Sequence, residues 1–218
     1  MKNSTTRDLF AYWNERRGNR VAPERGDIEP NAIRHVLGDS FFLAADTAAN
    51  YPFRLAGTRL CALFGRELKT DSFLCLWGKA EQLTIRKLVS AVIEEKVGVV
   101  ANATGRTADG APLMINLELL LLPLLHRNSM DARVLGALVP MTVPYWFGAR
   151  VLAPLELGML RHVGPSVDQG PVSRVIAAPK ALPVANTNIK TSLLPNGRLP
   201  TGGELKHGFM VFQGGRSD

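Results

Sequence analysis

The stretch FRLAGTRLCALFGREL, residues 53–68, decides the fold that the sequence predicts. A short apolar strand leads to Gly57, Thr58 can cap a helix, and Gly65 can take the left-handed conformation that ends it. A longer amphipathic helix is expected over 81–96, and three β-rich segments follow it. Helices that interrupt a sheet in this way indicate an α+β domain and argue against a doubly wound parallel sheet.

Five segments are expected to form one antiparallel sheet. The first two are separated by turn residues and form a hairpin, and the other three form a meander. The strands are expected over 40–45, 51–55, 97–107, 112–122 and 132–140. The predicted fold class is therefore α+β, with a five-stranded antiparallel sheet, helices packed on one face, an N-terminal flanking helix and an irregular C-terminal tail.

The chain is expected to have three parts. Residues 1–38 form an N-terminal helical flank, residues 39–147 the core domain, and residues 148–218 a proline-rich, loop-rich extension. Within the extension, 151–160 is expected to pack back on the domain as a short helix or strand. Residues 206–213 regain the alternation of a strand.

The composition excludes several classes of protein. The chain has 26 Lys and Arg against 19 Asp and Glu, a net charge of +7 that admits acidic partners without selecting one. No apolar run resembles a signal peptide or approaches the roughly 20 residues that span a bilayer. Cys61 and Cys75 are too few for a disulfide framework and are expected as buried thiols. We expect a cytoplasmic protein without membrane insertion.

Three blocks of the sequence resemble one known family. The second block is FRLAGTRLC with FGREL, within residues 53–68, and the third is HGFMVFQGGR, residues 207–216. The first block consists of Tyr12, Trp13, Arg16, Gly18, Arg20, Ala22, Pro23, Arg25, Asp27, Ile28 and Pro30. Together they look like a family of short bacterial PAS-domain proteins, found chiefly in alphaproteobacteria. The similarity leaves 165–203 unexplained.

This resemblance implies a PAS-like core that works as a cytosolic sensory or regulatory module in signal transduction, without an attached kinase or cyclase. Neither Cys61 nor Cys75 lies in the Asn-Cys-Arg context of flavin-adduct relatives, which argues against a blue-light receptor. Haem-binding relatives commonly carry a histidine in the helix that corresponds to 81–96, and this chain has none there. The four histidines are not paired at a spacing that places two metal ligands on one helix face. The cofactor therefore stays unidentified, and no metal site is expected.

The resemblance also implies where a small ligand would bind, because the interior of a PAS domain lies between its sheet and its helices. Most side chains there are expected to be ordinary core. A cavity between them would suit a small apolar or aromatic molecule. The candidate lining residues are Leu60, Phe64, Phe73, Trp77, Leu88 and Val92.

The N-terminal helix supplies the candidate interface with a protein partner. Leu9 and Trp13 recur at helical spacing, and Tyr12 and Arg16 lie beside them. This stripe can be buried either by the sheet of the same chain or by another protein. A sensory domain that has no attached kinase or cyclase must act by contact with another molecule. Our main hypothesis is therefore a non-catalytic regulator. It would bind a partner, or a second copy in a homodimer, through these four residues, with ligand occupancy as a switch.

Two other functions stay open. The first is a small-molecule enzyme that uses Asn116 or Glu118 at the mouth of a cavity, although the chain carries no recognised catalytic motif. The second is nucleic-acid binding, which the sequence disfavours because the basic residues of the tail are not interleaved with aromatic ones. Those basic residues are Arg174, Lys180, Lys190, Arg198 and Lys206.

Overall fold

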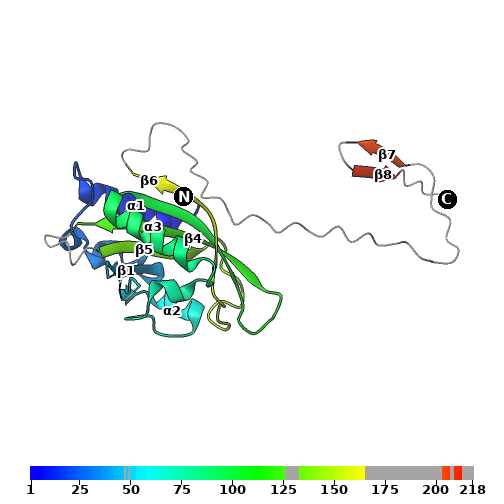
Figure 1. Ribbon diagram of the computed structural model, residues 1–218, viewed down its shortest axis with the longest axis horizontal. Coiled ribbons are helices and arrows are strands. Elements are labelled where there is room, and N and C mark those ends of the chain that lie inside the picture. The colour runs from blue at the N-terminus through cyan, green and yellow to red at the C-terminus, as the bar shows by residue number, and fades with distance from the viewer. Residues whose placement is uncertain (47, 49, 126–132, 165–202, 207–208, 213–218) are drawn as a thin grey trace. The chain divides into compact units, whose positions relative to one another are not determined.

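The computed structural model describes residues 1–46, 48, 50–125, 133–164, 203–206 and 209–212. A six-stranded antiparallel sheet, in the order β2-β1-β5-β4-β3-β6, forms its main body (Figure 1). The strands are β1 (Ser40–Ala44), β2 (Phe53–Ala56), β3 (Gly98–Arg106), β4 (Met114–Leu124), β5 (Arg133–Pro140) and β6 (Glu156–Val163). The predicted α+β class, the hairpin and the meander are confirmed, since β1 pairs with β2 and β4 lies between β3 and β5.

The crossover after β2 forms as residues 53–68 predict. β2 leads through Gly57 into α2 (Thr58–Phe64), and Gly65 ends that helix with a φ of 62°. A Cβ atom on Gly57 would lie only 2.1 Å from the carbonyl oxygen of Leu37. Glycine at this position therefore lets the start of α2 approach the preceding segment closely.

One face of the sheet is covered by α2, the 3-10 helix η4 (Phe73–Leu76) and α3 (Gln82–Glu95). The buried stripe of α3 is the one that its periodicity predicts. It consists of Ile85, Leu88, Val89 and Val92. We call the apolar cluster between these helices and the sheet the helix-side core.

The other face carries α1 (Ser4–Arg17) and three short 3-10 helices, η1 (Arg25–Asp27), η2 (Pro30–Ile33) and η3 (Leu37–Asp39). Asn3 caps α1, because its side chain accepts a 2.8 Å hydrogen bond from the Thr5 backbone N–H. Leu9 and Trp13 pack with residues of β4 and β5 in a second cluster, which we call the α1-side core.

The sheet has six strands where the sequence predicts five. β6 lies within residues assigned to the extension 148–218, yet it pairs with β3 along the edge of the sheet. Its register shifts opposite Asn102, where Gly158 and Met159 together face one residue. Such a bulge interrupts the alternation by which a strand is recognised. The ordered domain therefore extends past residue 147.

A second unit lies within Pro179–Asp218, and its described part is a hairpin of β7 (Gly203–Lys206) and β8 (Phe209–Phe212). β8 falls within the predicted strand 206–213. The segment 165–202, predicted as irregular, lies outside the described residues. Among the helices that the structure does describe, none is both long enough and apolar enough to cross a bilayer.

Candidate functional site

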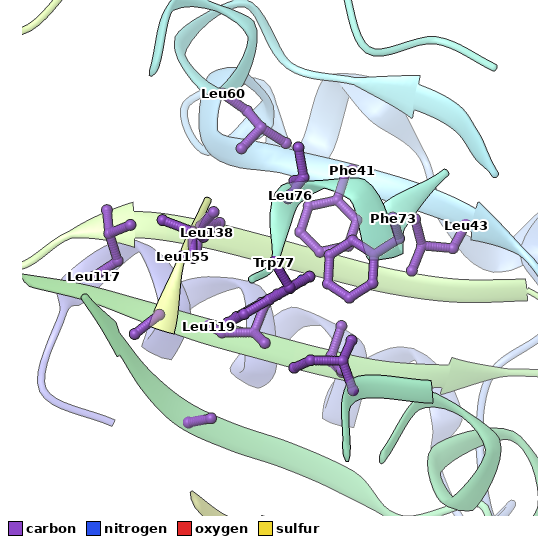
Figure 2. Close-up of a cluster of buried hydrophobic side chains, with 14 of the residues drawn as sticks. Phe41, Leu43, Leu60, Phe73, Leu76, Trp77, Leu117, Leu119, Leu138 and Leu155 are labelled. Carbon is purple, nitrogen blue, oxygen red and sulfur yellow. The ribbon is translucent and has the colours of Figure 1, made fainter. Parts of the chain in front are cut away.

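The helix-side core brings together most of the residues predicted to line a ligand cavity. Five of the six are at most 4% exposed: Leu60, Phe73, Trp77, Leu88 and Val92. Phe64, at the end of α2, is only half-buried and packs at the margin of the cluster. In Figure 2, Trp77 lies beside Leu119 of β4, and Leu60 of α2 lies near Leu76. Phe73 of η4 lies beside the ring of Phe41. The six residues therefore lie at one apolar cluster.

Trp77 supplies a polar group to this otherwise apolar cluster. Backbone hydrogen bonds fix the chain around it, since the Leu155 N–H donates to Leu76 O at 2.8 Å and the Gly78 N–H to Leu155 O at 3.0 Å. The indole ring also contacts Phe73 edge to face, with centroids 5.9 Å apart. Its Nε1–H is buried and has no acceptor within the described part of the chain. A buried indole N–H usually has a partner, so this group is available to an acceptor on a small ligand.

The predicted partner interface on α1 is largely buried within the chain. Leu9 and Trp13 are each 0% exposed, and the indole Nε1–H of Trp13 donates to the carbonyl oxygen of Pro123 at 2.9 Å. Tyr12 and Arg16 are half-buried beside them. The apolar stripe thus packs on the chain's own sheet, and Leu9 and Trp13 are not available to a partner while α1 is docked.

Glu118 anchors the start of α1 and is not at the mouth of a cavity. Its carboxylate is 2% exposed and accepts hydrogen bonds from the backbone N–H groups of Lys2, at 2.8 Å, and Asn3, at 3.2 Å. The Thr6 hydroxyl donates to it as well. These donors compensate the burial of a charged group. In the sequence, Glu118 stands out as a lone carboxylate within the apolar run of β4. The hypothesis that it acts as a catalytic group at a cavity mouth does not agree with this buried position.

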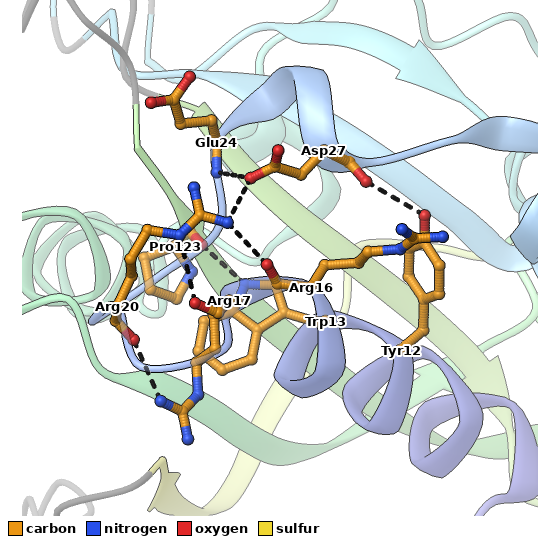
Figure 3. A network of polar contacts seen from close by, with 8 residues as sticks. All are labelled: Tyr12, Trp13, Arg16, Arg17, Arg20, Glu24, Asp27 and Pro123. Carbon is orange, nitrogen blue, oxygen red and sulfur yellow. Dashed lines mark hydrogen bonds and ion pairs between the residues drawn. The ribbon is translucent and has the colours of Figure 1, made fainter.

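The basic segment after α1 pairs largely within itself. Figure 3 shows Arg20 donating to the Asp27 carboxylate and to the Arg16 carbonyl, each at 2.7 Å. The Glu24 N–H also donates to Asp27 at 2.9 Å. This backbone hydrogen bond is the main cause that lowers the pKa of Asp27, and Arg20 lowers it further. Arg16 lies 3.7 Å from Glu29 and stacks over Tyr12. Two of its arginines, Arg16 and Arg20, are thus paired with carboxylates of the same chain.

Part of the α1-side face of the sheet is left uncovered. In antiparallel register Asn102 lies opposite Glu118, Thr104 opposite Asn116 and Arg106 opposite Met114, so these pairs share one face. The side chains of Met159 and Met114 are 82% and 52% exposed. We define the open sheet face as Asn102, Arg106, Met114, Asn116, Glu156 and Met159, all of which are exposed.

The thiols and histidines add no site among the described residues. Cys61 is half-buried, and burial raises the pKa of its thiol. Cys75 is exposed, so the expectation that both thiols are buried is wrong for it. In the ranges that the structure covers, no cluster of three or more His, Cys, Asp or Glu side chains could hold a metal ion. Of the basic tail residues, Arg174, Lys180, Lys190 and Arg198 lie outside those ranges.

A family model described as the PAS domain matches residues 1–139, which include α1, β1 to β4, most of β5 and every residue predicted to line the ligand cavity. β6 lies beyond the match. A search of the curated proteins found no match.

Proposed function

The chain belongs to the PAS domain family, whose members are typically sensory or regulatory modules, and we propose that this one acts in the cytoplasm by self-association through the open sheet face. The contact would be isologous, because a two-fold axis brings the same patch of two copies together. No catalytic step is part of the proposal.

The observation that carries the proposal is the half-covered α1-side face. α1 packs on β4 and β5, whereas Met114 at the start of β4 and Met159 of β6 stay exposed beside polar side chains of β3 and β6. Exposed apolar groups on an otherwise well-buried sheet favour an interaction surface, and methionine adapts to irregular partners. This location replaces the predicted interface at Leu9 and Trp13, since those two side chains serve the chain's own core.

Sedimentation velocity over a concentration series tests the proposal. We expect the wild-type chain to form dimers and the double variant Met114→Glu, Met159→Glu to stay monomeric, because two copies would place like charges face to face. Leu83→Glu is the matched control, since Leu83 is 62% exposed on α3, over the opposite face. A wild-type chain that stays monomeric at every concentration, or equal loss of dimer in the control, contradicts the proposal.

The helix-side core supports ligand occupancy as the switch. A small molecule there would need an apolar body and one acceptor for the Trp77 Nε1–H. Native mass spectrometry of the protein purified without additives tests this part. A non-covalent mass that leaves on denaturation is the expected result, and its loss in Trp77→Phe would locate it. A spectrum with the mass of the chain alone contradicts ligand control and leaves self-association untouched.

A further inference from the structure

A cleft lies on the opposite side of the sheet from the helix-side core. It has a volume of about 230 Å³ and is floored by Phe42 of β1 and Leu55 of β2. Ile28, Ile33 and Leu37 line its wall, and Arg25 is its only charged lining residue. None of the six residues predicted to line the ligand cavity contributes to it.

The walls of this cleft are held in place by close backbone contacts. Gly57 lies so near the Leu37 and Gly38 carbonyl groups that a side chain could not fit there, and its N–H donates to Ser40 O at 2.9 Å. Arg59 forms a 3.0 Å ion pair with Asp39, whose side chain is 8% exposed. The cleft is therefore preformed, which lowers the entropic cost of binding.

Arg25 is the polar group that distinguishes the cleft from a simple apolar groove. Its guanidinium stacks over the Phe42 ring at 4.4 Å from the centroid, and Nη1 donates to Ile28 O at 3.3 Å. Its Nε–H is buried and has no acceptor among the described residues. Arg16, Arg20 and Arg59 each have a carboxylate partner, but no such pair is found for Arg25 in the described part of the chain.

The electrostatic surroundings of Arg25 favour an added negative charge. Burial is the main cause that lowers the pKa of the Arg25 guanidinium, and the like charge of Arg133 lowers it further. An anion beside the guanidinium would offset both effects and could accept a charge-assisted hydrogen bond from it. The remaining lining is mainly apolar, so the site cannot compensate the burial of a phosphate dianion or a nucleotide.

We propose that this cleft binds a small monocarboxylic acid with an apolar body, whose carboxylate pairs with Arg25 while the body lies on Phe42 and Leu55. One molecule of liquid water takes about 30 Å³, and we allow about 20–30 Å³ for each non-hydrogen atom of a ligand. The cleft volume then admits on the order of ten such atoms. The inference goes beyond the proposed function, because it depends neither on self-association nor on a ligand in the helix-side core.

Isothermal titration calorimetry with octanoate as the probe tests the proposal. We expect one site per chain, with much weaker binding of octan-1-ol, which lacks the charge, and of acetate, which lacks the apolar body. Arg25→Met keeps a side chain over Phe42 but removes the charge, and should weaken octanoate binding by about 10- to 100-fold. Arg161→Met on exposed β6 is the matched control and should bind octanoate as the wild type does.

A second variant keeps the test valid if Arg25→Met folds poorly. Leu55 is 41% exposed, so Leu55→Asp should fold, and its carboxylate should abolish octanoate binding at the floor of the cleft. Absence of octanoate binding to the wild type, equal affinity in Arg25→Met, or equal affinity for octan-1-ol overturns the proposal. The proposal is also overturned if the wild type does not bind octanoate and Leu55→Asp no longer self-associates. A second copy of the chain would then be the occupant of the cleft.

Discussion

The two faces of the sheet each bury a tryptophan, but only one of these side chains has its hydrogen bond. Trp13, on the α1 side, donates to the Pro123 carbonyl, whereas the Nε1–H of Trp77, on the helix side, has no partner in the described chain. The α1 side is also held by the Glu118 anchor and the Arg20–Asp27 ion pair. The indole of Trp13 is thus satisfied within the chain, whereas that of Trp77 keeps one donor that a ligand could use.

This difference separates structural polar groups from those available for function. A satisfied buried polar group contributes to the stability and specificity of the fold, while an unsatisfied one costs free energy until something binds it. Both tryptophans are at most 1% exposed, so burial does not separate them. Variants should therefore affect the two faces differently.

The largest effect is expected from removing the aromatic side chain that joins α1 to the sheet. Trp13→Ala should lower the free energy of unfolding by about 3–5 kcal/mol, because it leaves a cavity and removes the bond to Pro123. Urea unfolding, followed by far-UV circular dichroism, measures this change. Leu83→Ala at an exposed position should cost far less. If the two variants are equally stable, α1 is not docked in solution.

A smaller effect is expected from breaking the anchor at the start of α1. Glu118→Ala should cost about 2–3 kcal/mol, because it removes the shared acceptor of the Lys2 and Asn3 N–H groups and of the buried Thr6 hydroxyl. Amide hydrogen exchange should also become faster over the first turn of α1. Asn116→Ala, two residues away and exposed, should change neither quantity. Unchanged exchange in Glu118→Ala would mean that the anchor does not restrain the helix.

A matched pair of substitutions compares the two indoles directly. Trp13→Phe and Trp77→Phe lose similar apolar area, but only the first gives up a hydrogen bond. Trp13→Phe should therefore be less stable than Trp77→Phe by about 1 kcal/mol in ligand-free protein. Equal losses in urea unfolding would show that the Trp77 Nε1–H also has an acceptor in solution.

The smallest effect is a pH dependence confined to the α1 side. The pKa of Asp27 is lower in the folded chain, so its contribution to stability is present above the unfolded value of about 3.9 and is lost as pH falls through the folded value. The melting temperature of Asp27→Asn should lie slightly below that of the wild type at pH 7, and the gap should narrow as the pH falls below about 3.9. Glu156→Gln on the open sheet face is the control. A gap that widens on acidification would contradict this assignment.

Local signals in the sequence predicted much of the fold. The crossover at residues 53–68 could be predicted because its cap, short helix and two glycines all act over a few residues. The segment 151–160 could be predicted only as a helix or strand that packs back on the domain, because the pairing of β6 with β3 depends on contacts far away in sequence and its bulge hides the alternation. Asn3 cannot be identified as the cap of α1 from the sequence alone, because Ser4, Thr5 and Thr6 are also capping residue types.

The candidate site was predicted less well, for a physical reason. Leu9 and Trp13 form an apolar stripe, and periodicity shows that such a stripe is buried but not what buries it. The six helix-side residues lie in or against one apolar cluster, as a PAS-like arrangement implies, and their role as the lining of a ligand cavity stays a prediction. Neither the unpartnered Trp77 donor nor the stacking of Arg25 on Phe42 has a signal in the sequence, because both depend on tertiary contacts.

The anchor between Asn3 and Glu118 joins residues 115 positions apart, and this separation has a consequence for synthesis on the ribosome. At about 5–20 residues per second, Glu118 is translated roughly 6–23 seconds after Asn3. During that interval the apolar stripe of α1 has no sheet to cover it. The nascent chain therefore needs protection early in translation, and a chaperone that binds near the N-terminus should raise the yield of folded protein more than one that acts after release.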